Sequence, residues 1–201
     1  MNMKKRFSTE KKTDYYLIYT LAFGIIGLIL YLQFYLNGKS LIWSHDGVPQ
    51  HLNSLAYYGE YLRNILHSVF VEHKFEIPMW DMHIGYGSDI LTTLHYYVIG
   101  DPLTLLSVFV SPEKTEYLYA FLIFLRIYLA GIAFSRYCFY HRNSKQAVLL
   151  GSLIYIFAGW TIYAAMKHPY FANPMIYLPL ILLGIDKIYR KEKPYVFIWS
   201  V

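Results

Sequence analysis

The chain has 201 residues, a length that suits one or two soluble domains. Its composition excludes that class: hydrophobic residues make up 56%, aromatic residues 19% and charged residues only 15%, against about 25% charged residues in an average globular domain. The single cysteine excludes an internal disulfide framework, and the high apolar content excludes disorder. The composition therefore predicts an all-α polytopic membrane protein.

Apolar runs predict four membrane spans and the start of a fifth. A span of about 20 residues covers a hydrocarbon core of roughly 30 Å, and the first run is too long for a signal-peptide core. The predicted order is a basic N-terminus at 1–14, spans at 15–36, 117–140, 147–166 and 174–189, loops at 37–116, 141–146, 167–173 and 190–194, and a truncated span at 195–201. We therefore expect the chain to be the N-terminal piece of a longer polypeptide, with further helices beyond Val201.

The distribution of basic residues predicts the orientation. Twelve of the 18 lie on one side of the membrane if the spans alternate: Lys4, Lys5, Arg6, Lys11, Lys12, Arg136, Arg142, Lys145, Lys187, Arg190, Lys191 and Lys193. The positive-inside bias puts this side in the cytoplasm of a bacterial cell, with loops 37–116 and 167–173 outside the plasma membrane. The net charge of +5 reflects this topology, and no nucleic-acid partner is expected.

The long loop contains two predicted elements of its own. Apolar residues recur at three- and four-residue intervals over 49–70, which predicts an amphipathic helix that lies on the membrane surface or packs into a bundle. The apolar part of 96–111 is too short to span, so this segment is expected to be re-entrant or interfacial.

Asp46 precedes the predicted amphipathic helix and is followed by Gly47. One interpretation is that it caps the helix or forms an Asx turn. The other is a functional carboxylate at the membrane surface, beside a helix end that stabilises anions. Further along the loop, Asp81, His83 and Asp89 are ligand types that suit Mg²⁺ or Mn²⁺, although their spacing is not diagnostic and turn chemistry with solvated acids is the favoured explanation.

Arg126 lies inside the second span, where a cation marks either a function or a structural pair with a carboxylate. Lys167 and His168, at the outer end of the third span, could receive a phosphate or could be an ordinary snorkelling end.

The chain resembles the bacterial YfhO family from about Tyr15 to its end. The motifs that carry the resemblance are Trp43…Asp46-Gly47…Gln50, Ala56-Tyr57-Tyr58-Gly59-Glu60-Tyr61-Leu62-Arg63, Trp80…Gly85-Tyr86-Gly87-Ser88-Asp89 and Leu94-His95-Tyr96-Tyr97-Val98-Ile99-Gly100-Asp101-Pro102-Leu103. Members are large multi-pass proteins similar to GT-C glycosyltransferases. The resemblance implies a catalytic aspartate in the first outer loop, a sugar donor on undecaprenyl phosphate and an envelope polymer, such as teichoic or lipoteichoic acid, as acceptor.

The resemblance assigns Asp46 as the catalytic carboxylate, with Asp89 and Asp101 as weaker companions. His45 replaces the acidic or small residue that we associate with the family before this aspartate, although an imidazole can also ligate a metal. Many GT-C enzymes use a divalent cation, so Mg²⁺ or Mn²⁺ is a possible cofactor.

The mechanism expected is an inverting transfer in which Asp46 deprotonates the acceptor hydroxyl. Cationic groups would bind the donor phosphate; the candidates are Arg63, Arg126, Lys167 and His168. The candidates for sugar contact are Trp43, Gln50, Tyr57, Trp80, Tyr96 and Tyr97, although interfacial anchoring is the favoured explanation of the aromatic residues. The alternatives are a transporter or flippase of lipid-linked sugars and a non-catalytic envelope scaffold.

Overall fold

The structure is a computed structural model that describes the backbone of residues 3–201 and the side chains of residues 14–201. The side chains of Lys4, Lys5, Arg6, Lys11 and Lys12, on which the predicted basic N-terminus rests, lie outside the described residues. The chain forms two compact units. We call them the helical unit (the described part of Met1–Leu41, with Leu125–Tyr163 and Phe171–Val201) and the loop unit (Ile42–Phe124 with Ala164–Tyr170).

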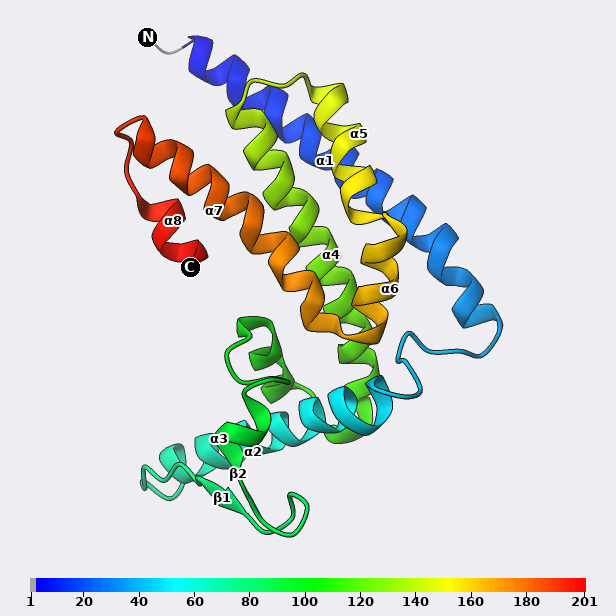
Figure 1. Cartoon of the computed structure of the whole chain (residues 1–201), viewed down its shortest axis with the longest axis vertical. Helices are drawn as coiled ribbons and strands as arrows, with labels where there is room; N and C mark the ends of the chain where they lie inside the picture. Colours follow the sequence, from blue (N-terminus) through cyan, green and yellow to red (C-terminus); the bar gives the residue numbers. More distant parts are fainter. Residues whose placement is uncertain (1–2) are drawn as a thin grey trace. The chain divides into compact units, whose positions relative to one another are not determined.

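The helical unit contains the apolar helices (Figure 1). They are α1 (Met3–Leu36), most of α4 (Thr115–Tyr140), α5 (Lys145–Ile156), the first part of α6 (Gly159–Lys167), α7 (Asn173–Tyr189) and α8 (Tyr195–Ser200). Within the described residues, three helices are long and apolar enough to cross a membrane, and a fourth span results if the bent pair α5–α6 is counted as one. The chain is therefore an all-α polytopic membrane protein, which confirms the fold class predicted from composition.

Buried hydroxyl groups connect α1, α4 and α5. The Tyr15 hydroxyl lies 2.7 Å from the Ser135 Oγ, which lies 2.8 Å from the Ser152 Oγ. Ser135 also donates to the Gly131 carbonyl oxygen at 2.6 Å. Small residues let apolar helices approach closely, and hydroxyl hydrogen bonds between helices add stability where no water competes. These contacts hold α1 against α4 and α5.

The predicted span at 147–166 corresponds to two helices, α5 and α6, which are bent by 45° at a short break and together pass as one candidate span. The break lies at Phe157 and Ala158. The Thr161 hydroxyl donates to the Tyr155 carbonyl oxygen at 3.1 Å, so a side chain satisfies a backbone group near the break. No proline marks the bend, and the apolar run continues through it.

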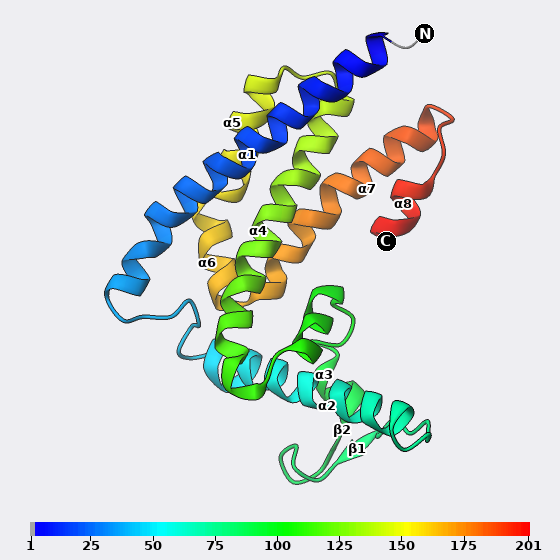
Figure 2. The same cartoon turned by 180° about the vertical axis from the view of Figure 1, so that it is seen from behind.

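The loop unit is built around a helix that begins as a π turn (Figure 2). It begins with the π-helix η1 (Gly47–Leu52) and the α-helix α2 (Asn53–Phe70). An antiparallel hairpin of β1 (Trp80–Asp81) and β2 (Ser88–Asp89) follows, then α3 (Ile90–Leu94) and the 3-10 helices η2 (Pro102–Phe109) and η3 (Pro112–Lys114). The unit also includes the start of α4 and the segment 164–170, in which the 3-10 helix η4 (Pro169–Ala172) begins. The predicted helix at 49–70 is thus α-helical only from Asn53, and the predicted segment 96–111 consists of turns followed by η2. Whether either element lies in the membrane surface stays a prediction.

Gly59 and Arg63 fix η2 against α2. A Cβ atom on Gly59 would lie 2.6 Å from the Ser107 carbonyl oxygen, so only glycine permits this approach. One turn further, an Arg63 guanidinium nitrogen donates to the carbonyl oxygens of Ser107 at 3.0 Å and Val110 at 2.6 Å. The packing of η2 on α2 therefore depends on the absence of a Cβ atom at Gly59 and on the Arg63 guanidinium, which satisfies backbone carbonyls.

We predict that Gly59→Ala destabilises the loop unit by about 1–3 kcal/mol, because backbone, which cannot rotate away, occupies the space of the new methyl group. Gly24→Ala in α1 is the matched control, since nothing lies within 4 Å of a Cβ atom there. The measurement is the thermal unfolding midpoint of the purified chain in detergent. Equal midpoints for the two variants would contradict the packing described here.

Candidate functional site

The carboxylate of Asp46 is positioned by a π turn at the start of η1. The His51 amide donates to the Asp46 carbonyl oxygen, and the Val48 amide to that of Trp43, each five residues back. Gly47 allows this turn to pack on the preceding segment, because a Cβ atom there would lie 2.9 Å from the Ile42 Cγ2. Asp46 stands at the N-cap position, yet its side chain caps no amide. The capping interpretation of Asp46 is therefore wrong, and its carboxylate has other neighbours.

Those neighbours are Lys167 and His168, which follow each other at the end of α6. The Asp46 Oδ2 lies 3.9 Å from the Lys167 Nζ and 3.7 Å from the His168 Nε2. The Asp46 and Lys167 side chains are 29% and 33% exposed, so this ion pair is reachable from solvent. The structure thus brings the predicted catalytic carboxylate together with two of the four predicted phosphate-binding residues.

His51 belongs to the same site and was not predicted from the sequence. Its side chain is buried, and its Nε2 lies 2.8 Å from the His168 Nδ1. Burial lowers the pKa of His51 to about 4, with a further contribution from His168 and an opposing one from Asp46. The His51 imidazole is therefore neutral near pH 7. His51 lies five residues after Asp46, and residues at that spacing are brought together by a π turn but not by an α-helix. The spacing would therefore have indicated His51 only if a π turn had been expected.

The hydrogen bond between the two imidazoles indicates which nitrogens carry protons. The His51 Nδ1 is buried without a hydrogen-bond partner, and a proton there would leave a buried donor unsatisfied. We therefore assign the proton to the His51 Nε2, which donates to the His168 Nδ1. A neutral His168 then carries its proton on Nε2, on the side of Asp46. The chain of groups from His51 through His168 to Asp46 orients the second imidazole toward the carboxylate.

Aromatic rings surround the histidine pair. The His51 ring centroid lies 5.5 Å from that of Tyr97 and 5.2 Å from that of Tyr170, and the Tyr170 ring lies 5.0 Å from that of Tyr96. The Tyr97 hydroxyl donates to the Gln50 Oε1 at 3.4 Å. Three predicted sugar-contact residues, Gln50, Tyr96 and Tyr97, therefore lie at this site. Tyr170 was not predicted.

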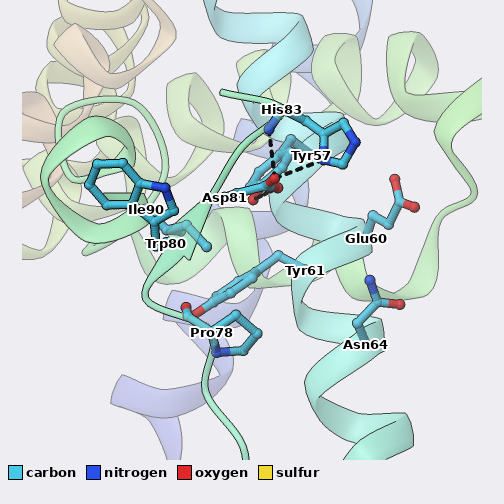
Figure 3. A pocket seen from close by; sticks show the side chains of 9 residues that line it. All are labelled: Tyr57, Glu60, Tyr61, Asn64, Pro78, Trp80, Asp81, His83 and Ile90. Atoms are coloured by element: carbon cyan, nitrogen blue, oxygen red, sulfur yellow. Dashed lines mark hydrogen bonds and ion pairs between the residues drawn. The ribbon is translucent and has the colours of Figure 1, made fainter. Parts of the chain in front are cut away.

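The other predicted sugar-contact residues lie elsewhere in the loop unit. Trp43 accepts the Val48 amide through its backbone carbonyl, at the π turn. Tyr57 and Trp80 line a separate pocket of about 460 Å³ between α2 and the hairpin (Figure 3). The predicted aromatic contacts thus divide between the histidine pair and this pocket.

The remaining two predicted phosphate-binding residues have structural partners. The Arg63 guanidinium donates to backbone carbonyls of the η2 segment. Arg126 is 3% exposed in the helical unit, and its Nε donates to the Asn173 Oδ1 at 3.0 Å. The Arg63 charge is thus held by carbonyl dipoles, and its assignment to the donor phosphate stays a prediction. Arg126 connects α4 to α7.

The predicted metal ligands do not converge. Asp89 caps α3 by accepting the Thr92 amide at 2.7 Å, and Asp101 caps η2 by accepting the Leu103 amide at 2.9 Å. The His45 Nδ1 lies 3.1 Å from its neighbour Ser44 Oγ. Within the described residues, no three His, Cys, Asp or Glu side chains are grouped so that they could hold a metal ion. His45, Asp89 and Asp101 are thus not brought together as one ligand set, and a divalent cation stays a prediction.

We predict that the stability of the chain rises with pH between about pH 4 and pH 6.5 because of His51. The unfolded chain binds a proton at this histidine in that range and the folded chain does not, so stability is lost as the pH falls. His51→Gln removes the titrating group while an amide can still donate to His168. The thermal midpoint of this variant, measured from pH 7 to pH 4.5, should fall less than that of the wild type. Parallel curves would contradict the assignment.

Comparison with known proteins agrees with the architecture. A family model described as bacterial membrane protein YfhO matches residues 18–201. No curated protein matches the chain, and no solved structure matches it. The family match covers both units and includes Asp46, His51, Lys167 and His168. The chain therefore belongs to the family of the bacterial membrane protein YfhO.

Proposed function

We propose that this chain is part of a membrane glycosyltransferase that transfers a sugar from undecaprenyl phosphate to a cell-envelope polymer of the teichoic or lipoteichoic acid class. The observation that carries the proposal is the Asp46 carboxylate, which caps no helix and lies beside Lys167 and His168. A reachable carboxylate next to cationic or proton-donating groups is the minimum arrangement for moving a proton and stabilising a phosphate.

In the proposed reaction, Asp46 accepts the proton of the acceptor hydroxyl as the hydroxyl oxygen attacks the anomeric carbon. The bond from that carbon to the donor phosphate oxygen breaks, and undecaprenyl phosphate leaves with the electron pair. The Lys167 ammonium neutralises the developing negative charge. The His51–His168 pair orients a second donor toward the same place. Tyr96 and Tyr97 offer ring faces for the transferred sugar.

The proposal places these steps at the outer surface of the plasma membrane, with the N-terminus in the cytoplasm. Its support is the distribution of basic residues, which the positive-inside bias assigns to the cytoplasmic side. The Mg²⁺ or Mn²⁺ that the resemblance allows finds no convergent set of three ligands among the described side chains. No step of the proposed reaction is therefore assigned to a metal.

A flippase of lipid-linked sugars is the second candidate, and two features of the helical unit favour it. Arg126 is a buried cation in an apolar helix, and α5–α6 is a broken helix of the kind that transporters use near their substrate sites. A flippase must move its substrate across a bilayer, whereas a transferase can act in detergent without a bilayer.

We predict that Asp46→Asn lowers sugar transfer by about 100- to 10,000-fold, the usual contribution of a general base, without reducing the amount of protein in the membrane. The measurement is transfer from undecaprenyl phosphate-linked sugar to an envelope polymer in detergent micelles, with the intact natural polypeptide. Asp89→Asn is the matched control, because asparagine caps helices as well as aspartate does.

Two results would contradict this proposal. Full activity of Asp46→Asn would remove the carboxylate from the mechanism. Sugar movement across proteoliposomes by a wild-type protein that transfers nothing in detergent would favour the flippase.

A further inference from the structure

The pocket between α2 and the hairpin is separate from the Asp46 site and is lined by aromatic and polar side chains (Figure 3). Its volume is about 460 Å³, within the range of small-ligand sites. One wall comes from α2, whose contributing residues recur at three- and four-residue spacing along a single face. The opposite wall is the hairpin with the residues that flank it. The lining residues are Tyr57, Glu60, Tyr61, Asn64, Pro78, Trp80, Asp81, His83 and Ile90.

The aromatic wall of the pocket is held in a fixed orientation. The rings of Tyr57 and Tyr61 are nearly parallel, with centroids 6.5 Å apart and an interplanar angle of 12°. The Tyr57 hydroxyl donates to the Asp81 Oδ2 at 2.6 Å, and the Tyr61 hydroxyl donates to the Pro78 carbonyl oxygen at 3.0 Å. Hydrogen bonds from both hydroxyl groups thus hold the two rings against the hairpin side of the pocket. The rings therefore lose little conformational entropy when a ligand binds.

Trp80 supplies a third aromatic surface and is 60% exposed. Its indole lies over Gly87, where a Cβ atom would be 3.2 Å from the Trp80 Nε1 and where φ is +103°. Both the close approach and the backbone conformation require glycine. The Trp80 Nε1 also lies 3.3 Å from the Met82 sulfur. An indole that is held in place and still open to solvent is a surface on which a flat ligand face can stack.

The charge of the pocket limits the ligands that it can accept. Asp81 accepts hydrogen bonds from the Tyr57 hydroxyl and from the His83 amide, and these lower the pKa of the Asp81 carboxyl to about 2. Glu60 adds a second carboxylate. The nine lining side chains include no Lys or Arg, and the one imidazole among them, that of His83, lies with its Nδ1 2.9 Å from the Asp81 Oδ1. A phosphate group would be repelled here. Hydroxyl groups, in contrast, can donate to carboxylate and amide oxygens.

We propose that this pocket is a subsite for uncharged sugar residues of the acceptor glycan, with one residue stacked on Trp80 and a neighbouring residue hydrogen-bonded by Glu60 and Asn64, which lie on the other side of the hairpin strand (Figure 3). The inference rests on the proposed function for its acceptor, and it narrows that acceptor to a polymer with at least one sugar residue that carries no phosphate. Ring faces combined with carboxylate and amide groups match the two kinds of surface that a sugar presents, its C–H face and its hydroxyl rim.

The test measures binding by saturation-transfer NMR with the full chain in detergent. The probes are four neutral disaccharides, maltose, cellobiose, lactose and gentiobiose, with glucose 1-phosphate and choline for comparison. We expect at least one disaccharide to bind, and Trp80→Ala to weaken its binding by about threefold to tenfold. Tyr86→Ala is the matched control, since Tyr86 is fully exposed on the same hairpin and does not line the pocket. Glu60→Gln should also weaken binding.

Four results would overturn the subsite: no disaccharide binds, Trp80→Ala and Tyr86→Ala behave alike, glucose 1-phosphate binds as tightly as the best disaccharide, or choline binds more tightly. Asp46→Asn separates this inference from the proposed function, because it should bind the disaccharide as the wild type does. Sugar binding by a wild-type protein that transfers nothing supports the subsite and refutes the transferase. Transfer without sugar binding overturns the subsite alone.

Discussion

The imidazole rings of His51 and His168 share a part-buried hydrogen bond of 2.8 Å within the loop unit, between segments that are far apart in the sequence. His51 is buried and His168 is half-buried, so the bond is partly shielded from water. It holds the end of α6 against the π turn of η1. The proximity of Lys167 and His168 to Asp46 follows from it, since both belong to the short segment that the bond anchors. The bond excludes simultaneous protonation of both facing nitrogens, because one of them must accept.

The roles of Asp89, Asp101 and Arg63 in the loop unit follow from the backbone groups near them. Asp89 and Asp101 satisfy amides at helix starts, and Arg63 satisfies carbonyls at the end of η2. Their charges are thereby used to complete helix ends and turns. Asp46 differs because the π turn satisfies the local amides through main-chain carbonyls, which leaves its carboxylate oriented toward Lys167. The secondary structure thus separates a carboxylate suited to chemistry from carboxylates that stabilise the fold.

Elements with a long, periodic apolar pattern were predictable from the sequence, whereas features that depend on a single residue were not. The apolar helices and α2 were predicted from runs of many residues. The break between α5 and α6 was not, because Gly159 is its only local signal. Asp46, Lys167 and His168 were each singled out, but no spacing rule places segments so distant side by side. His51 was missed because α-helical geometry, assumed over 49–70, gives a five-residue spacing no meaning. The capping roles of Asp89 and Asp101 were within reach, since each precedes a helix start.

The position of the pocket relative to the histidine pair follows from the helix that carries both. The pocket residues of α2 begin six residues after His51 and end thirteen residues after it, which corresponds to about 9–20 Å along a helix. Because η1 and α2 are continuous and η2 braces α2 through Gly59 and Arg63, this separation cannot vary much. In the proposed reaction, an acceptor of one sugar unit could occupy only one of the two places at a time. A polymer can occupy both, with one residue held in the pocket while another presents its hydroxyl to Asp46, so a rigid helix would favour extended acceptors over free sugars.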